Sequence, residues 1–268
     1  MESKKIGIIG NGRYGKWLGR FFLDRDCPII VHDKNTEFSL QEAVEWADVV
    51  IFAVSSRSVI EVIKSAIPYE KADQLWMDID SFKYAPIGAM QASKAEVVGL
   101  HPLCAPPTGE TWHGETIAVC RFRLSRWTDW VEEFLRETAA KIIEVTPSNH
   151  DFLMLGDQNL VHASAIAQAA VINSFNFDKV LMLELATKLS RKQFGVIARV
   201  FSLDPALVAH IQIANPWNVD LLEKQISYLT ELRRMVASKN YDALEAHISS
   251  IKEGLGDEFL KKASTFFE

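Results

Sequence analysis

The first half of the chain alternates short β-rich runs with amphipathic segments. Strand candidates are rich in β-branched residues and end at turn residues, and helix candidates repeat apolar residues every three or four positions. The run at 48–54 is continuously apolar, as is typical of a strand buried on both faces. Strands are expected at 5–10, 28–33, 48–54, 74–79, 96–101, 116–120 and 141–145. Helices are expected near 13–24, 57–66, 83–92 and 125–139.

The second part of the chain is dominated by long helical periods. We expect helices at 151–174, 178–201, 204–235 and 240–267. Pro205 directly after Asp204 is typical of a helix start, and the sequence NPWN at 215–218 is expected to break or kink the third period. The pattern predicts an α/β domain with a mainly parallel sheet over 1–147, followed by an all-α domain over 148–268.

A glycine-rich turn directly follows the first strand and opens the first helix. Its first glycine allows the tight turn, its second lets the backbone approach a pyrophosphate, and its third allows close helix–strand packing. The helix N-terminus attracts the phosphate charge. The motif therefore predicts that the first domain is a Rossmann dinucleotide-binding domain. The expected cofactor-binding residues are Gly10, Asn11, Gly12, Arg13, Tyr14 and Gly15.

An acidic residue at the end of the second strand indicates which dinucleotide binds. Asp33 lies 23 residues after Gly10, where a carboxylate accepts hydrogen bonds from the adenosine ribose. A carboxylate also repels the 2′-phosphate of NADP, so we expect NAD as the cofactor. His32 and Lys34 beside it leave the strictness of this preference open.

Composition excludes several classes of partner. Lys and Arg total 29 and Asp and Glu total 35, a net charge of −6 that gives no electrostatic case for binding nucleic acid. The three cysteines are widely spaced and suggest neither a disulfide framework nor a metal site. No apolar run has the length of a membrane span, and the glycine motif begins too early for a signal peptide. We therefore expect a cytoplasmic protein without a membrane partner.

Three further segments resemble motifs of the prephenate dehydrogenase (TyrA-like) family. Residues 78–83 (DIDSFK) resemble its D-x-x-S-x-K signature, and residues 99–103 (GLHPL) resemble its G-x-H-P-M segment. Residues 150–162 (HDFLMLGDQNLVH) resemble its H-D-x-x-M-x-x-x-Q-x-L-x-H helix. Arg199 lies where the family has a substrate-binding arginine. The resemblance is closest to the dehydrogenase part of bifunctional enzymes that also carry a chorismate mutase domain, which we do not expect before Gly10.

The resemblance implies a specific reaction and its alternatives. The family reaction is NAD-dependent oxidative decarboxylation of prephenate, a dicarboxylate, to 4-hydroxyphenylpyruvate in tyrosine biosynthesis. Arogenate and 4-amino-4-deoxyprephenate are alternative substrates for the same chemistry. A β-hydroxyacid or imine reductase type of dehydrogenase and a non-catalytic NAD-binding protein are rival interpretations. The resemblance also implies a homodimer formed through the helical domain.

Two residues at strand ends are the candidate catalytic groups. His101 follows a predicted strand, where open α/β sheets bind ligands, and a neutral imidazole can take the proton of a substrate hydroxyl. Its alternative role is to bond the backbone at the strand end. By resemblance, Ser81 lies near His101 and the nicotinamide; its alternative role is to cap the helix that starts near Phe82. Lys83 is expected to stabilise local structure.

The substrate-binding candidates lie in the helical part. Gln158 and His162 are four residues apart and share a helix face, where a buried polar group needs either substrate or another side chain as its partner. Arg199 has apolar neighbours and offers a planar fork for a carboxylate; its alternative role is a structural ion pair. His150 and Asp151 are expected at the start of their helix, where Asp151 would favour the helix dipole.

Overall fold

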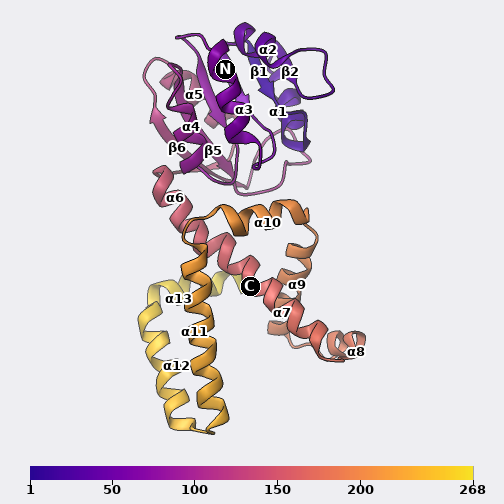
Figure 1. Cartoon of the computed structure of the whole chain (residues 1–268), viewed down its shortest axis with the longest axis vertical. Helices are drawn as coiled ribbons and strands as arrows, with labels where there is room; N and C mark the ends of the chain where they lie inside the picture. Colours follow the sequence, from indigo (N-terminus) through magenta and orange to yellow (C-terminus); the bar gives the residue numbers. More distant parts are fainter. Residues whose placement is uncertain (268) are drawn as a thin grey trace. The chain divides into compact units, whose positions relative to one another are not determined.

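A seven-stranded sheet forms the centre of the N-terminal part in the computed structural model, which describes residues 1–267 (Figure 1). The strand order is β2-β1-β3-β4-β5-β6-β7. Neighbouring strands are parallel except for β5 and β6, which are antiparallel. The strands are β1 (Ile6–Ile9), β2 (Ile29–His32), β3 (Val49–Phe52), β4 (Leu75–Asp78), β5 (Glu96–Pro102), β6 (Thr116–Arg123) and β7 (Lys141–Glu144).

Helices cover both faces of this sheet. The clusters of buried side chains place α1 and α5 on one face and α2, α3 and α4 on the other. This arrangement confirms the predicted α/β fold with a mainly parallel sheet. The helices are α1 (Arg13–Leu23), α2 (Leu40–Trp46), α3 (Val59–Ala66), the 3₁₀ turn η1 (Ile67–Tyr69), α4 (Tyr84–Met90) and α5 (Thr128–Glu137).

The central strands are apolar throughout because both of their faces are buried. Ile51 of β3 packs into the cluster that contains α1, whereas its neighbours Val50 and Phe52 pack into the cluster with α2, α3 and α4. Successive side chains of a strand point to opposite faces, so a strand between two helical layers needs an apolar residue at every position. This confirms the interpretation of the run at 48–54.

The helix α2 was not predicted, although its sequence carries a start signal. Ser39 caps the helix by accepting a hydrogen bond from the Glu42 amide, and the Glu42 side chain accepts one from the Ser39 amide. This reciprocal capping box satisfies two backbone donors that the helix leaves unpaired. Its Ser-x-x-Glu spacing is visible in the sequence.

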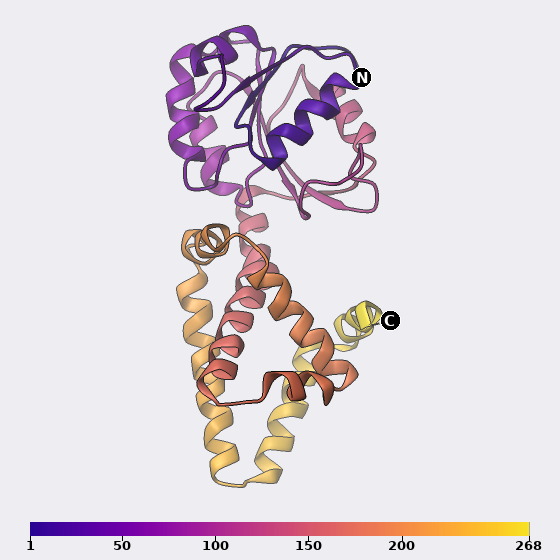
Figure 2. The same ribbon diagram turned by 90° about the vertical axis from the view of Figure 1, so that its right-hand side faces the viewer.

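The chain after β7 is helical, as predicted. Helix α6, a π-helical turn and α7 follow one another without a break (Figure 2). Buried Asn159 in the π-turn donates to the Ile211 carbonyl at 2.7 Å and accepts from Asn215 at 3.1 Å, which joins the turn to α10. The elements are α6 (Pro147–Met154), the π-turn (Leu155–Asn159), α7 (Leu160–Ser174), α8 (Lys179–Glu184), α9 (Lys188–Phe201) and α10 (Pro205–Ala214).

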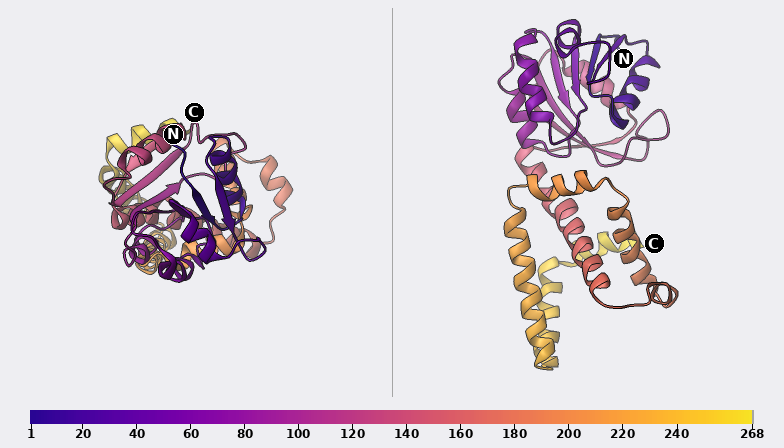
Figure 3. Two further views of the ribbon diagram at one scale, coloured as in Figure 1. Left: turned by 90° about the horizontal axis from the view of Figure 1, so that it is seen from above. Right: turned by 45° about the vertical axis from the view of Figure 1, so that its right-hand side comes forward.

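The remaining helices belong to a separate compact unit that begins at Trp217. Within it, α11 and α12 run side by side (Figure 3). The break predicted at 215–218 is confirmed, because α10 ends before it and α11 begins at Asn218. The period at 240–267 is also interrupted, at Gly256, which has φ +76°. The elements are α11 (Asn218–Ala237), α12 (Tyr241–Leu255), α13 (Asp257–Ser264) and the 3₁₀ turn η3 (Thr265–Phe267).

Within the described part of the chain, no single helix has the length and apolar character to cross a bilayer. The α9–α10 pair, which is bent by 97°, reaches the threshold by length and composition alone.

Candidate active site

The glycine turn between β1 and α1 has the geometry that a dinucleotide phosphate requires. Gly10 adopts φ +116°, and a Cβ there would lie 2.5 Å from the Ala53 carbonyl oxygen. A Cβ on Gly15 would lie 1.9 Å from the Gly10 carbonyl oxygen. Gly12, in contrast, is the N-cap of α1 without a side-chain cap, and a Cβ there would meet nothing within 4 Å. Open space therefore faces the amide end of the helix, where an anion is favoured.

Asp33 lies directly beside this turn. Its carboxylate accepts the Asn11 amide at 2.6 Å and the Lys34 amide at 2.7 Å. The hydrogen bond from Asn11 is the main reason why the pKa of Asp33 lies below its usual value. The turn thus holds an ionised acid at the end of β2, where a ribose hydroxyl can donate to it.

The remaining residues of the motif have different environments. Arg13 is exposed, whereas the Tyr14 hydroxyl donates to the Cys104 carbonyl at 2.6 Å. The Trp17 indole donates to the Gly109 carbonyl at 2.9 Å. Both contacts join α1 to the segment 103–115 between β5 and β6. One side of the dinucleotide-binding region is therefore formed by this irregular segment.

The imidazole of His101 belongs to a chain of three buried polar side chains. Its Nδ1 lies 3.0 Å from Nε2 of His150, and Nδ1 of His150 lies 2.7 Å from Oδ1 of Asp151. His101, His150 and Asp151 are 4 %, 1 % and 3 % exposed. The partner of His101 Nδ1 is therefore a side chain, His150, and not the backbone.

Asp151 lies on α6 but accepts hydrogen bonds from backbone amides at the start of α4. Its Oδ1 accepts the Lys83 amide at 2.8 Å and its Oδ2 accepts the Tyr84 amide at 3.0 Å, at the N-terminus of α4. The expectation that His150 and Asp151 begin their own helix is wrong. Helix α6 begins at Pro147 with Thr146 as its cap, because proline suits the first helical position.

Lys83 forms a buried ion pair beside the end of β5, the strand that carries His101. Its ammonium pairs with Asp78 and donates to the Leu100 carbonyl at 2.7 Å. Both side chains of the pair are 0 % exposed. The Leu100 carbonyl belongs to the residue before His101, so the lysine holds the end of β5 in place. Ser81 does not cap α4, which begins at Tyr84, and the hydrogen bonds among residues 1–267 do not involve its hydroxyl.

Burial determines the protonation of His101. Desolvation by burial is the main reason why the pKa of His101 lies well below its usual value, and the charge of Lys83 lowers it further. The imidazole is therefore neutral at physiological pH and carries a lone pair that can accept a proton.

Two further predicted residues present buried polar atoms. Oε1 of Gln158, in the π-turn, and Nδ1 of His162, on α7, are buried and have no hydrogen-bond partner in the described part of the protein. Burial lowers the pKa of His162. Arg199 lies exposed on α9, which packs against α7. Its guanidinium forms no ion pair within residues 1–267, so the alternative of a structural ion pair does not apply there.

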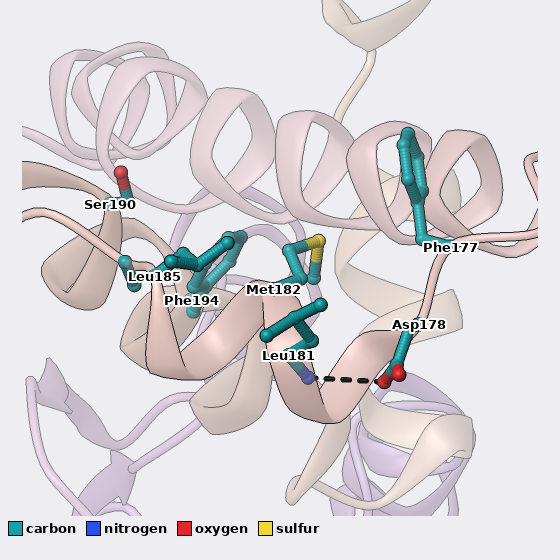
Figure 4. A pocket seen from close by; sticks show the side chains of 8 residues that line it. Phe177, Asp178, Leu181, Met182, Leu185, Ser190 and Phe194 are labelled. Carbon is teal, nitrogen blue, oxygen red and sulfur yellow. Dashed lines mark hydrogen bonds between the residues drawn. The ribbon is translucent and has the colours of Figure 1, made fainter.

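A separate cavity of about 460 Å³ lies between α8 and α9 (Figure 4). It contains none of the predicted site residues. Its lining is mainly apolar, and it is formed by Phe177, Asp178, Leu181, Met182, Leu185, Ala186, Ser190 and Phe194. Neither this cavity nor any other part of the described chain gathers three residues suited to hold a metal ion.

Comparison with known proteins identifies both parts of the chain. Residues 25–144 match the model for the prephenate dehydrogenase nucleotide-binding domain, and residues 146–250 match that for the prephenate dehydrogenase dimerization domain. A "Probable arogenate/prephenate dehydrogenase" of Methanocaldococcus jannaschii is 28 % identical over 94 % of this chain and 61 % of its own length. The "T-protein" of Haemophilus influenzae is 24 % identical, over 98 % of this chain and 71 % of its own.

A solved structure has the same fold. The prephenate dehydrogenase from A. aeolicus, in complex with hydroxyphenyl propionate and NAD⁺, superposes with a TM-score of 0.74. The similarity covers 95 % of this chain and 98 % of that one at 16 % identity. The chain spans about three fifths of the length of the M. jannaschii relative, so that relative contains sequence with no counterpart here.

Proposed function

Because the chain belongs to the prephenate dehydrogenase family of oxidoreductases, we propose that it catalyses the NAD-dependent oxidative decarboxylation of prephenate to 4-hydroxyphenylpyruvate. The observation that carries this proposal is the buried, neutral His101 at the carboxyl end of β5, in the same sheet as the glycine turn. Ligands of open α/β sheets bind beyond the carboxyl ends of the strands, so substrate and dinucleotide would meet there.

In this reaction His101 acts as the base. Bound NAD supplies the hydride acceptor. As the hydride leaves the ring carbon that bears the hydroxyl, the hydroxyl proton passes to Nε2 of His101. The bond to the ring carboxylate then breaks, CO₂ leaves, and its electron pair completes the aromatic ring. Aromatisation provides the driving force, so the chain's own task is alignment and proton transfer.

The cofactor proposal rests on the glycine turn and Asp33. The open space at Gly12 and the amide end of α1 suit the pyrophosphate. Asp33 would accept the ribose hydroxyls and disfavour a 2′-phosphate. Arg13, which is exposed beside the turn, is free to approach the phosphates.

The substrate proposal rests on unpaired groups in the helical part. A dicarboxylate needs donors, and the guanidinium of Arg199 is available for a bidentate contact. The buried unpaired atoms of Gln158 and His162 would be satisfied by bound substrate. We propose that Ser81, which by resemblance to the family lies near His101, orients substrate and nicotinamide. Arogenate and 4-amino-4-deoxyprephenate are the alternative substrates.

We further propose a homodimer formed through an all-α domain that follows a Rossmann domain over 1–147. The match to a dimerization domain supports it, as do large apolar side chains such as Val180 and Leu185, which are 69 % and 74 % exposed in the single chain. Three free cysteines are consistent with the reducing cytoplasm as its location.

Nicotinamide reduction by the purified protein tests the function. Prephenate, arogenate and 4-amino-4-deoxyprephenate are offered in parallel with NAD and then with NADP. We expect rapid reduction with prephenate and NAD. His101→Asn is expected to slow turnover by roughly 10²–10⁴ while NAD binding is unchanged. Absence of reduction with all three substrates, in a protein that binds NAD, would refute the proposed activity.

A further inference from the structure

We propose that His150 and Asp151 are positioning residues that fix the orientation and tautomer of the His101 imidazole. This inference deepens the proposed function and rests on it. It is carried by the hydrogen-bonded chain from Asp151 through His150 to Nδ1 of His101, in which every member is buried. His101 lies on β5 and the other two residues on α6, so two different elements must meet to form the chain.

The direction of each hydrogen bond follows from Asp151. Both of its carboxylate oxygens accept backbone N–H groups at the start of α4, and a carboxylate has no proton to donate. Nδ1 of His150 is therefore the donor to Asp151. In the proposed arrangement His150 carries one proton, on Nδ1, so its Nε2 can only accept. Nδ1 of His101 must be the donor to it, 3.0 Å away.

This direction leaves the second nitrogen of His101 as a base. The proton of a neutral imidazole is on one nitrogen, and the hydrogen bond that this nitrogen makes selects the tautomer. With Nδ1 protonated, Nε2 of His101 has a lone pair, and it makes no hydrogen bond within residues 1–267. In the opposite tautomer Nε2 would present N–H to the substrate hydroxyl and could not take its proton.

The hydrogen-bonded series from Asp151 through His150 to His101 also stabilises His101 after it has taken the proton. A protonated His101 keeps its Nδ1–H directed at His150, and the dipole of His150 is oriented by the negative Asp151 beyond it. The positive charge of Lys83 opposes protonation of His101, but Lys83 is paired with Asp78. The titratable and charged groups around His101 are His150, Asp151, Lys83, Asp78 and Cys120.

Kinetics of a matched pair of variants test the role of His150. His150→Ala removes the acceptor, and we expect kcat to fall about 10²-fold. KM and the Kd for NAD should change less than about threefold, because neither ligand contacts His150 in this proposal. His150→Gln can place its Oε1 near the former Nε2 and accept from His101, so it should restore at least about tenfold of the lost kcat. His247→Gln, on α12 of the separate compact unit, is the control and should match the wild type.

The pH profile separates positioning from a merely structural role. Removing the His150 ring weakens the desolvation that holds the pKa of His101 low. His101 must be neutral to act, so the acid limb of kcat/KM should move to higher pH in His150→Ala. Equal kcat in the alanine and glutamine variants, or kcat within about threefold of wild type in both, would overturn the proposal.

Nitrogen-15 NMR of the wild-type protein with NAD, and without substrate, tests the tautomer directly. The His101 signals are assigned by their loss in His101→Asn. We expect a protonated Nδ1 and a bare Nε2 in the wild type and in His150→Gln. A protonated Nε2 in the wild type refutes the positioning role even if turnover is normal. Absence of turnover together with the expected tautomer refutes the proposed function alone, so the two failures are distinguishable. The measurement also holds if His150→Ala does not fold.

Discussion

The buried pair of Lys83 and Asp78 gives a quantitative prediction for Lys83→Met. Methionine fills the space of the lysine stem but removes the ammonium that pairs with Asp78 and donates to the Leu100 carbonyl. Both partners are 0 % exposed, so water does not replace the lost contacts. Where Asp78 is ionised, breaking a buried ion pair in this way costs about 3–5 kcal/mol, since one charge stays buried and unpaired. The unfolding equilibrium constant should rise by about two to nearly four powers of ten.

The pH dependence of this loss has a definite sign. Burial raises the pKa of Asp78 to about 7, even with Lys83 beside it. In the unfolded chain this pKa is about 3.9. Between the two values the folded protein binds more protons than the unfolded chain, so its stability falls as pH rises. This fall ends near pH 7 in the wild type. Without Lys83 the pKa of Asp78 is higher still, so the difference between variant and wild type should widen above pH 7, by up to about 1.4 kcal/mol per pH unit.

Urea unfolding, followed by tryptophan fluorescence at about pH 6 and about pH 8.5, measures this difference. Trp76 and Trp112 are fully buried in the N-terminal part and report its unfolding. Adding Asp78→Asn to Lys83→Met should recover stability at the higher pH, because no carboxylate is left to ionise. Lys64→Met, at an exposed position of α3, should stay within about 0.5 kcal/mol of wild type. A loss below about 1 kcal/mol at the higher pH, or an equal loss at both pH values, would refute the reasoning.

Four further substitutions test the cofactor and substrate sites. Gly15→Ala should disrupt the glycine turn and lower the melting temperature, because its Cβ would lie 1.9 Å from a carbonyl oxygen. Gly12→Ala should preserve the melting temperature and weaken NAD binding about tenfold or more. Equal melting temperatures of the two variants would contradict this. Asp33→Asn should raise kcat/KM for NADP relative to that for NAD by about tenfold. An unchanged ratio would exclude charge repulsion by Asp33 as the cause of a preference for NAD. Arg199→Lys should raise the substrate KM about tenfold with the Kd for NAD unchanged, and equal losses for both would contradict a role at the substrate.

The sequence predicted the seven strands and most helices around them because both layers of the N-terminal part follow simple periods. The strand at 49–52 is apolar at each position, and the helix at 13–23 buries one face through Trp17, Phe21 and Phe22. Interruptions in the helical part were harder to predict. The period at 178–201 is divided at Leu185, where a short turn leads to Thr187 as the cap of α9. The apolar pattern continues across this turn and does not reveal it.

The partners of the site residues could not be predicted from spacing. His101 and His150 are 49 residues apart, and Lys83 and Asp151 are 68 residues apart. These pairs form only when α6 reaches the end of β5 and packs against α4, and local patterns do not encode such tertiary contacts. The sequence does place Asp151 next to a histidine, but a carboxylate near a helix start suits its own dipole equally well. The roles of Ser81, Gln158, His162 and Arg199 stay predictions.

The double duty of Asp151 constrains how this protein can evolve. Its carboxylate accepts the amides at the start of α4 and also lies in hydrogen-bond contact with His150, so a substitution there removes a helix cap and the proposed support of His101 together. Few residue types can make both sets of hydrogen bonds, so we expect few neutral substitutions at this position. The segment 103–115 has no regular structure and joins α1 through backbone carbonyls, which any residue provides. Changes in ligand preference are therefore expected to arise by substitution in that segment, while the histidine chain stays fixed.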